Sequence, residues 1–337
     1  MRVAINGFGR IGRVFFRQAL GHKGIDVVAV NDLGSVDNLA YLLKYDSVYG
    51  RFNKEVGHKT GDEHHIVVGG KDIRFFQESE PSKLPWKELK IDVVVESTGV
   101  FDSFEKAKPH LEAGAKRVVI TAPAHDDNAS VTFTPNVGAD LIAKSRITSN
   151  ASCTTNAATP IAAIMMNEPG IKKAILNTVH GYTATQGLVD GPSGKDMRRG
   201  RAAAVNIVPS STGAAEAVIK AAPFMKGKFE GIAMRVPVVS GSLIDFTFTA
   251  SRETSAEEIN DIFRKAASSP EWKGILKVSE EPLVSTDILG ESYGSIVDPA
   301  FTRVVGGDLV KVLSWYDNEW GYGAMLLKHV ESLEDYL

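Results

Sequence analysis

Short apolar runs alternate with an amphipathic stretch through the first half of the chain. β-like runs cover residues 2–6, 26–31, 92–96 and 116–121, and a helical pattern passes through Val14 and Leu20. This alternation predicts a parallel sheet with crossover helices. The runs Val93 to Val95 and Val118 to Ile120 contain no polar residue, which is typical of strands covered on both faces.

Polar residues follow these buried runs directly. Ser97, Thr98 and Gly99 come after the first of them, and Thr121 after the second. Open parallel sheets bind ligands at the carboxyl ends of their strands. We therefore expect a ligand crevice at these residues.

The pattern changes after about residue 150. Longer β-like runs cover residues 173–179, 231–239, 243–250 and 302–315, with hairpin signals at Ser240-Gly241-Ser242 and Gly306-Gly307. Helical patterns cover residues 212–222, 255–268 and 322–333, and Ser255 with Glu258 has the spacing of a capping box. The second half is predicted to be a mostly antiparallel sheet with helices, and we expect the last helix to return to the first half.

Composition and charge favour small-molecule chemistry. The 337 residues carry a net charge of −3, which gives no basic surface for nucleic acid or an anionic membrane. The longest uncharged stretch, Ile147 to Asn167, contains many hydroxyl and amide side chains and is interpreted as a turn and a buried helix, not a membrane span. The single cysteine, Cys153, and an N-terminus without the pattern of a signal peptide fit a cytoplasmic protein.

Three glycines form a dinucleotide-binding pattern. Gly7, Gly9 and Gly12 follow the first β-like run as G-x-G-x-x-G. Asp32 stands at the end of the second β-like run, about 20 residues after Gly12. Such glycines allow a tight turn and a close approach of the backbone to a pyrophosphate, while the acid holds ribose hydroxyls. The same carboxylate would repel the 2′-phosphate of NADP, so NAD is the expected cofactor.

Cys153 is a candidate nucleophile. It lies in the segment Ser149 to Asn156, which directly precedes the apolar run Ala157 to Met166, and a helix beginning there would lower the pKa of the thiol and offer N–H groups to an oxyanion. The alternative is an inert buried thiol.

His180 is the preferred partner of this thiol among eight histidines. It ends a β-like run and opens a polar loop, whereas most of the others stand in charged, surface-like contexts. His64 and His65 beside two acids could suggest a metal, but a solvated turn is the simpler interpretation and no metal site is expected.

Several arginines suggest anion binding. Arg235 lies in an apolar β-like run, where an unpaired charge is costly, so it must reach a partner or an anion. Arg198, Arg199 and Arg201 share a loop with Lys195, where salt bridges at a subunit contact are the alternative. Ser210 to Gly213, before a helix, forms another candidate anion site.

Together these segments closely resemble the phosphorylating glyceraldehyde-3-phosphate dehydrogenase family over essentially the whole chain. The motifs that carry the resemblance are Ile5 to Arg13, Leu42 to Gly50, Ser149 to Asn156, Asp196 to Ala203, Pro209 to Ala214 and Trp315 to Tyr322. The resemblance implies a Rossmann domain for NAD over residues 1–151, an α+β catalytic domain over 152–317 and a returning C-terminal helix over 318–337.

The resemblance also implies a glycolytic or gluconeogenic reaction. Cys153 would attack the aldehyde of D-glyceraldehyde 3-phosphate with His180 as general base, and hydride would pass to the nicotinamide. Inorganic phosphate would then attack the resulting thioester and release 1,3-bisphosphoglycerate. The segment Tyr182 to Arg201 resembles the family's S-loop, which implies a homotetramer, and its Pro192 is typical of NAD-preferring members.

The family's binding residues carry over position by position. Thr183 and Arg235 match ligands of the substrate phosphate. The positions that match the site of inorganic phosphate are Ser152, Thr154, Arg199, Thr212 and Gly213. Those that match the cofactor site are Gly7, Gly9, Arg10, Ile11, Gly12, Asp32, Ser97, Thr98, Thr121, Asn318 and Tyr322, the last two orienting the nicotinamide.

Three departures from the family's pattern limit this carry-over. Glu78-Ser79-Glu80-Pro81 lacks an arginine expected at the adenine edge, so NAD affinity is expected to be altered. The region Asp126 to Ala139 does not match the usual strand and loop. Ala157 replaces a second cysteine, which removes one route to an oxidative disulfide.

Three other hypotheses about the function stay open. Erythrose-4-phosphate dehydrogenase shares the Cys/His pair but makes an acid, and Asp32 with the phosphate-site residues argues against it. Aspartate-semialdehyde dehydrogenase is disfavoured by the matches around Cys153 and Arg199. A non-catalytic NAD-binding regulatory protein is disfavoured by the complete set of candidate catalytic residues.

Overall fold

The computed structural model describes residues 1–126, 131–194 and 196–337 in two compact units. Unit 1 contains residues 1–133, 139–151 and 326–337, and unit 2 contains residues 134–138 and 152–325. Part of the atypical region Asp126 to Ala139, namely residues 127–130, lies outside the described residues, as does Lys195 of the arginine-rich loop. No described helix is both long enough and apolar enough to cross a bilayer.

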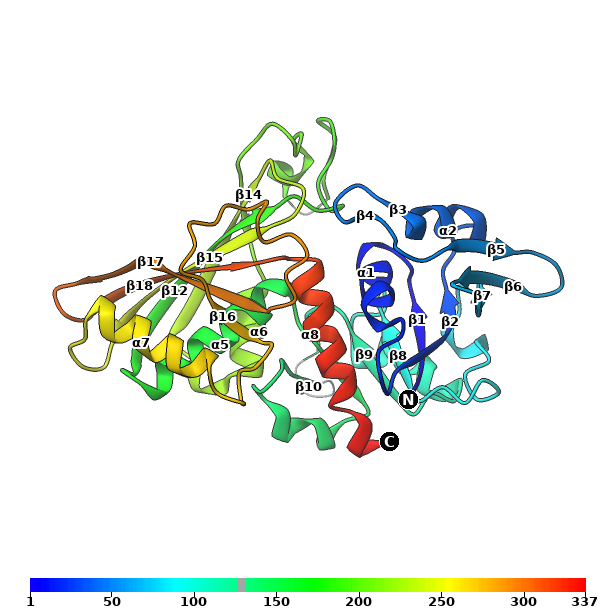
Figure 1. The fold of residues 1–337 in the computed structure, drawn as a ribbon, viewed down its shortest axis with the longest axis horizontal. Coiled ribbons are helices and arrows are strands. Elements are labelled where there is room, and N and C mark those ends of the chain that lie inside the picture. The colour runs from blue at the N-terminus through cyan, green and yellow to red at the C-terminus, as the bar shows by residue number, and fades with distance from the viewer. Residues whose placement is uncertain (127–130, 195) are drawn as a thin grey trace. The chain divides into compact units, whose positions relative to one another are not determined.

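Unit 1 is built on a sheet whose order, within the described residues, is β10-β11-β9-β8-β1-β2-β7-β6-β5 (Figure 1). The strands are β1 (Arg2–Asn6), β2 (Asp26–Asn31), β5 (Val56–Lys59), β6 (His64–Val68), β7 (Lys71–Phe76), β8 (Val93–Glu96), β9 (Arg117–Ile120), β10 (Val131–Thr132) and β11 (Ile147–Ser149). β3 (Tyr45–Asp46) and β4 (Gly50–Arg51) form a separate hairpin.

The order of this sheet creates a switch point. β1 pairs in parallel with β2 on one side and with β8 on the other. Among the described strands of this sheet, only the pairs β5·β6 and β6·β7 are antiparallel. The carboxyl ends of β1, β2 and β8 therefore converge where a doubly wound sheet opens to a ligand, which confirms the predicted Rossmann-type sheet.

Short helices complete unit 1. They are α1 (Arg10–Ala19), α2 (Val36–Lys44), α3 (Phe104–Ala107), α4 (Pro109–Glu112) and the 3₁₀ turns Pro81–Lys83, Ala139–Lys144 and Glu334–Tyr336. Apolar side chains of the sheet such as Val94 and Val118 pack with Trp86 and Ala107 in one buried cluster. The uninterrupted apolar runs Val93 to Val95 and Val118 to Ile120 are thus explained by cover on both faces, because all four residues of β8 and of β9 are buried.

Unit 2 is built on a mostly antiparallel sheet, in which the described residues give the order β13-β14-β12-β15-β18-β17-β16. Its strands are β12 (Ile171–Gly181), β13 (Val208–Ser211), β14 (Phe229–Val236), β15 (Ser242–Ala250), β16 (Leu276–Val278), β17 (Ser295–Val305) and β18 (Leu309–Tyr316). The pairs β12·β14 and β16·β17 are parallel. The predicted sheet is confirmed, and the run at 302–315 is a hairpin of β17 and β18 that turns at Gly306 and Gly307.

Helices cover one face of this second sheet. They are α5 (Cys153–Asn167), α6 (Ala214–Ala221) and α7 (Ala256–Ala267), with 3₁₀ turns at Met197–Gly200 and Pro223–Met225. Ile161, Val218 and Phe263 of these helices share one buried cluster with Phe246 and Phe248 of β15. Figure 1 shows the labels of α5, α6 and α7 on one side of this sheet. Helix α8 (Trp320–Glu331) begins in unit 2 and ends in unit 1.

Candidate functional site

A cavity of about 360 Å³ lies at the switch point of unit 1. It is lined by Asn6, Gly7, Gly9, Asn31, Asp32, Leu33, Glu78, Ser79, Ser97, Thr98, Val100 and Phe101. We call it the dinucleotide cavity. It brings together five of the predicted cofactor residues, whereas Arg10, Ile11, Gly12 and Thr121 do not line it.

The glycines of the motif are required for different reasons. Gly7 has φ +92°, and a Cβ there would lie 2.6 Å from the Thr98 nitrogen. A Cβ on Gly12 would lie 2.2 Å from the Gly7 oxygen. A Cβ on Gly9, the residue that precedes α1, would meet no atom within 4 Å, so this side of the loop is open. An open backbone at a helix N-terminus fits a pyrophosphate.

Asp32 is held in place by backbone donors. Its Oδ2 accepts from the Phe8 N–H at 2.6 Å, and its Oδ1 accepts from the Gly34 N–H at 2.8 Å. Each carboxylate oxygen has a further lone pair, so acceptors remain for two ribose hydroxyls. The Arg10 side chain is engaged with Asp46 at 2.5 Å. The cavity residues therefore fit NAD, and the carboxylate of Asp32 offers the acceptors that ribose hydroxyls require.

The candidate nucleophile begins a helix of unit 2. Cys153 is the first residue of α5, and the preceding Ser152 caps this helix by accepting from the Thr155 N–H at 3.0 Å. His180 is the penultimate residue of β12, and its Nε2 lies 3.3 Å from Cys153 Sγ. The structure thus brings together the thiol and imidazole that the sequence had paired.

Strand register places Arg235 beside this histidine. β12 and β14 run parallel with His180 opposite Arg235. Nη1 of Arg235 lies 2.8 Å from His180 Nδ1 and donates to the Gly181 oxygen at 3.1 Å. The same Gly181 oxygen is 2.6 Å from His180 Nδ1. When Nδ1 carries the ring hydrogen it donates to Gly181, which leaves the Nε2 lone pair facing the thiol.

Burial and the Arg235 charge set the protonation of this pair. Burial raises the pKa of the Cys153 thiol, although Arg235 and the N–H groups of Thr154 and Cys153 act to lower it. Burial and the Arg235 charge lower the pKa of His180 to about 3. The expectation of a lowered thiol pKa is therefore wrong in net direction, because desolvation outweighs the helix N-terminus. A thiol faces a neutral imidazole that can accept its proton.

Tyr316 is a site residue that the sequence analysis missed. Its buried hydroxyl bonds the Thr154 hydroxyl at 2.9 Å and the Thr178 hydroxyl at 2.8 Å. Its ring meets the His180 ring edge to face at 5.9 Å. Thr154 follows the nucleophile and Thr178 stands two residues before the histidine, so Tyr316 joins α5 to β12. Only the position of Tyr316 in the Trp315 to Tyr322 motif could have indicated this role.

Other predicted anion ligands lie in the same unit. Arg199 donates through Nε and Nη2 to the Ser210 hydroxyl at 3.0 and 2.7 Å. The Thr212 hydroxyl accepts from the Ala214 N–H at 3.1 Å, and Gly213 precedes α6. Thr183 bonds Thr185 at 2.9 Å.

Asn318, a predicted nicotinamide contact, is held in one orientation. Its Oδ1 accepts from the Gly241 N–H at 3.0 Å and the Ser242 hydroxyl at 2.8 Å. A backbone N–H can only donate, so the amide oxygen is fixed on this side. Tyr322, the second predicted contact, is buried in α8.

Two histidines contradict the surface-like interpretation. His110 and His329 are both 0% exposed. Lys108 and Glu112 near His110 are exposed and Lys328 beside His329 is half-buried, so the charged neighbours in the sequence suggested a surface position. Among the described residues, no group of three or more His, Cys, Asp or Glu could hold a metal ion.

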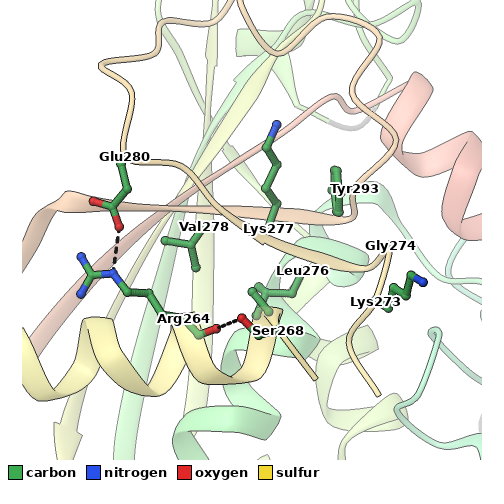
Figure 2. Close-up of a pocket in the computed structure, with 10 residues that line it drawn as sticks. Arg264, Ser268, Lys273, Gly274, Leu276, Lys277, Val278, Glu280 and Tyr293 are labelled. Carbon is green, nitrogen blue, oxygen red and sulfur yellow. Dashed lines mark hydrogen bonds and ion pairs between the residues drawn. The ribbon is translucent and has the colours of Figure 1, made fainter. Parts of the chain in front are cut away.

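Figure 2 shows another cavity of unit 2, of about 340 Å³, beside α7 and β16. None of the predicted site residues lines it. Arg264 there donates to Glu280 at 2.8 Å, and Lys277 to Glu291 at 2.9 Å. These cations are paired with carboxylates, so the cavity offers no reactive group comparable to Cys153.

Comparisons with known proteins match parts of both units. Residues 1–104 match the family model of the glyceraldehyde 3-phosphate dehydrogenase NAD binding domain, and residues 152–318 match that of its C-terminal domain. Glyceraldehyde-3-phosphate dehydrogenase 2 of Kluyveromyces marxianus is 47% identical over 98% of both chains. Glyceraldehyde-3-phosphate dehydrogenase of Borreliella burgdorferi is 46% identical over 99% of both.

Proposed function

Because the chain belongs to the glyceraldehyde 3-phosphate dehydrogenase family, we propose that it converts D-glyceraldehyde 3-phosphate, NAD and inorganic phosphate to 1,3-bisphosphoglycerate and NADH. The observation that carries this proposal is the 3.3 Å approach of Cys153 Sγ to His180 Nε2 at the start of α5. Unit 1 would hold the cofactor and unit 2 would perform the acyl chemistry, in the division of the two matched family models.

The first step forms a carbon–sulfur bond. Cys153 Sγ attacks the aldehyde carbon while His180 Nε2 takes the thiol proton and returns it to the former carbonyl oxygen, giving a thiohemiacetal. The low pKa of His180 keeps this nitrogen free to accept at neutral pH. The N–H groups at the start of α5 would support the negative charge on that oxygen.

Bound NAD supplies the hydride acceptor that turns the thiohemiacetal into a thioester. His180 Nε2 would take the hydroxyl proton in this oxidation. A phosphate oxygen then attacks the thioester carbon and the carbon–sulfur bond breaks. The leaving thiolate of Cys153 takes back the proton held by His180 Nε2, and the proton of the attacking phosphate is released. The products are the acyl phosphate and the free enzyme.

Two groups of residues would hold the two phosphates. Arg235 and Thr183 would bind the phosphate of the substrate, since a guanidinium has five N–H donors and most remain after the bond to the Gly181 oxygen. The inorganic phosphate would be bound by Ser152, Thr154, Arg199, Thr212 and Gly213. The Thr154 hydroxyl is engaged by Tyr316, so its share in this site would come from the backbone.

The cofactor contacts are proposed for the remaining residues. Asp32 would bind the ribose hydroxyls, and the loop from Gly7 to Gly12 with Arg10 and Ile11 would bind the pyrophosphate. Ser97 and Thr98 would lie on the adenosine side, and Thr121 would be a further cofactor contact. Asn318, with its oxygen fixed by Gly241 and Ser242, would present its amide nitrogen to the nicotinamide carboxamide, with Tyr322 beside it.

We further propose a cytoplasmic homotetramer. A single free cysteine suits a reducing compartment. Between residues 188 and 207, Leu188, Val189, Met197, Val205 and Ile207 are 68–88% exposed, which is unusual for so many large apolar side chains in one segment. A second copy of the chain would cover them. Light scattering should give a mass four times that of the chain.

The reaction is tested by following NADH formation with and without inorganic phosphate. Turnover of glyceraldehyde 3-phosphate that requires phosphate would support the proposal. Turnover without phosphate, or faster turnover of erythrose 4-phosphate to an acid, would replace it with the hydrolysing alternative. NAD binding without turnover of either sugar phosphate would favour a regulatory protein.

A further inference from the structure

A buried hydrogen-bonded network lies beneath the dinucleotide cavity. Its centre is Glu96, the last residue of β8, which is 2% exposed. Oε1 of Glu96 accepts from the Thr98 N–H at 2.8 Å and from the Thr98 hydroxyl at 2.5 Å. Oε2 accepts from Asn6 Nδ2 at 2.5 Å and pairs with His110 Nε2 at 3.0 Å. One carboxylate therefore receives four donors.

The tautomer of His110 follows from its second partner. The Trp86 indole N–H points at His110 Nδ1 at 3.0 Å. An indole nitrogen can only donate, so Nδ1 is the acceptor and Nε2 carries the hydrogen that is donated to Glu96. Trp86 and His110 are both 0% exposed. Trp86 thus fixes the direction of the bond that reaches Glu96.

The network continues to the wall of the cavity. Asn6 Oδ1 accepts from Asn31 Nδ2 at 2.7 Å. Asn31 Nδ2 also donates to the backbone oxygen of Glu78, and Asn31 Oδ1 accepts from the backbone N–H of Glu78, both at 2.9 Å. Asn6, Asn31, Glu78 and Thr98 line the dinucleotide cavity, whereas Glu96 does not. Glu96 therefore touches residues at the carboxyl ends of neighbouring strands without facing the ligand space itself.

We propose that Glu96, oriented by His110 and Trp86, is a positioning residue that sets the affinity for the adenosine diphosphate portion of the cofactor. It fixes Thr98 against Gly7, where the packing leaves no room for a Cβ, and it fixes Asn6 and, through it, Asn31. The inference rests on the proposed cofactor site and adds to it residues that do not contact the ligand.

A carboxylate is the side chain this position needs. Glutamine has the same shape, but its NH₂ group can only donate. In Glu96→Gln, that group would face either the donors of Thr98 or those of Asn6 and His110. One side of the network must then break or shift, and a buried donor without an acceptor is costly. The cavity wall should move while the rest of the sheet is retained.

The test is calorimetric titration of NAD and of ADP-ribose, which lacks the nicotinamide. Four proteins are compared: the wild type, Glu96→Gln, Trp86→Phe and the control Ile147→Val, which trims a buried side chain of the same unit away from the cavity. Glu96→Gln should weaken both ligands by the same factor, about tenfold or more, with kcat at saturating NAD within about twofold. Trp86→Phe keeps an aromatic ring but removes the donor to His110, and should weaken both ligands by about threefold.

Each result has a separate meaning. Affinities for ADP-ribose within about twofold of wild type in both variants, with melting temperatures lowered as in Ile147→Val, would overturn the inference. A lowered kcat at saturating NAD with unchanged affinity would also overturn it. If Glu96→Gln does not fold, Trp86→Phe decides alone. If the wild type binds NAD but not ADP-ribose, the proposed cofactor site is itself wrong, which this design separates from failure of the network.

Discussion

Removal of one buried hydroxyl, in Tyr316→Phe, tests how the nucleophile and the base are held together. The change deletes the bonds to Thr154 at 2.9 Å and Thr178 at 2.8 Å. The phenyl ring keeps its edge contact with His180. Changes in the free energy of unfolding and in kcat can therefore be assigned to the lost hydroxyl and not to repacking of the ring.

The cost follows from the partners that remain. Thr178 can still donate to the Leu243 oxygen at 3.3 Å, whereas Thr154 loses the bond to the phenol. Two neutral hydrogen bonds at about 1 kcal/mol each predict a loss of about 1–3 kcal/mol in the free energy of unfolding. A shift of Thr154 moves the neighbouring Cys153, and misplacement of a reacting atom is expected to lower kcat by about tenfold or more, with KM nearly unchanged.

Urea unfolding, steady-state kinetics and the rate of Cys153 alkylation would be measured together. Tyr293→Phe is the matched control, since Tyr293 is a half-buried tyrosine of the same unit whose ring faces Lys277. The control should leave kcat unchanged. A Tyr316→Phe protein that loses the expected stability but keeps kcat within about twofold of wild type would refute the positioning role.

Three further predictions concern protonation and backbone strain. Burial lowers the pKa of His329 in the folded protein to about 3, so the unfolded chain binds an extra proton as pH falls below 6.5, and the free energy of unfolding drops by about 2 kcal/mol at pH 5. In His329→Gln, the difference in this free energy between pH 7.5 and pH 5, measured in urea, should shrink by that amount. An undiminished difference would contradict this prediction. Arg235→Gln removes a charge that lowers the pKa of the Cys153 thiol, so the pH-rate profile of iodoacetamide alkylation should move to higher pH; a move to lower pH would show that the cation does not act on the thiol. Gly7→Ala places a Cβ 2.6 Å from the Thr98 nitrogen in a backbone with φ +92°. The substitution should lower the free energy of unfolding in urea by about 2 kcal/mol or more and weaken NAD binding. An unchanged free energy and an unchanged affinity would mean that the loop relaxes freely.

Local patterns predicted most of the framework. The strands β1 and β2 end at Asn6 and Asn31 as the apolar runs do, and α7 begins after Ser255, whose hydroxyl accepts from the Glu258 N–H at 3.1 Å. These boundaries depend on neighbours in the sequence, through periodicity and capping. The turn at Gly7 was predictable for the same reason, since a left-handed backbone at a strand end requires glycine.

Pairings set by the register of distant strands could not be predicted. His180 meets Arg235 because β12 and β14 are adjacent and in parallel register, and no local pattern reports that register. Tyr316 reaches Thr178 across β15, which lies between β18 and β12.

Burial within short helices was equally hidden. His110 lies in the four-residue helix α4, too short to show a hydrophobic period, and its neighbours Lys108 and Glu112 suggested a surface. The hydrogen-bonded network around Glu96 could not be predicted either, because it depends on the sheet order β9-β8-β1-β2. The pKa of the Cys153 thiol is raised because the thiol is desolvated, and only the packing of the folded chain determines that desolvation.

The central claim, that Cys153 carries the acyl group, is tested most directly by a single turnover without phosphate. The wild type mixed with NAD and glyceraldehyde 3-phosphate should release about one NADH per subunit and then stop, with the acyl mass on the peptide that contains Cys153. Addition of inorganic phosphate should release that mass and restart turnover. Cys153→Ser should give no burst. A burst in that variant, or steady turnover without phosphate and without an adduct, would contradict the account.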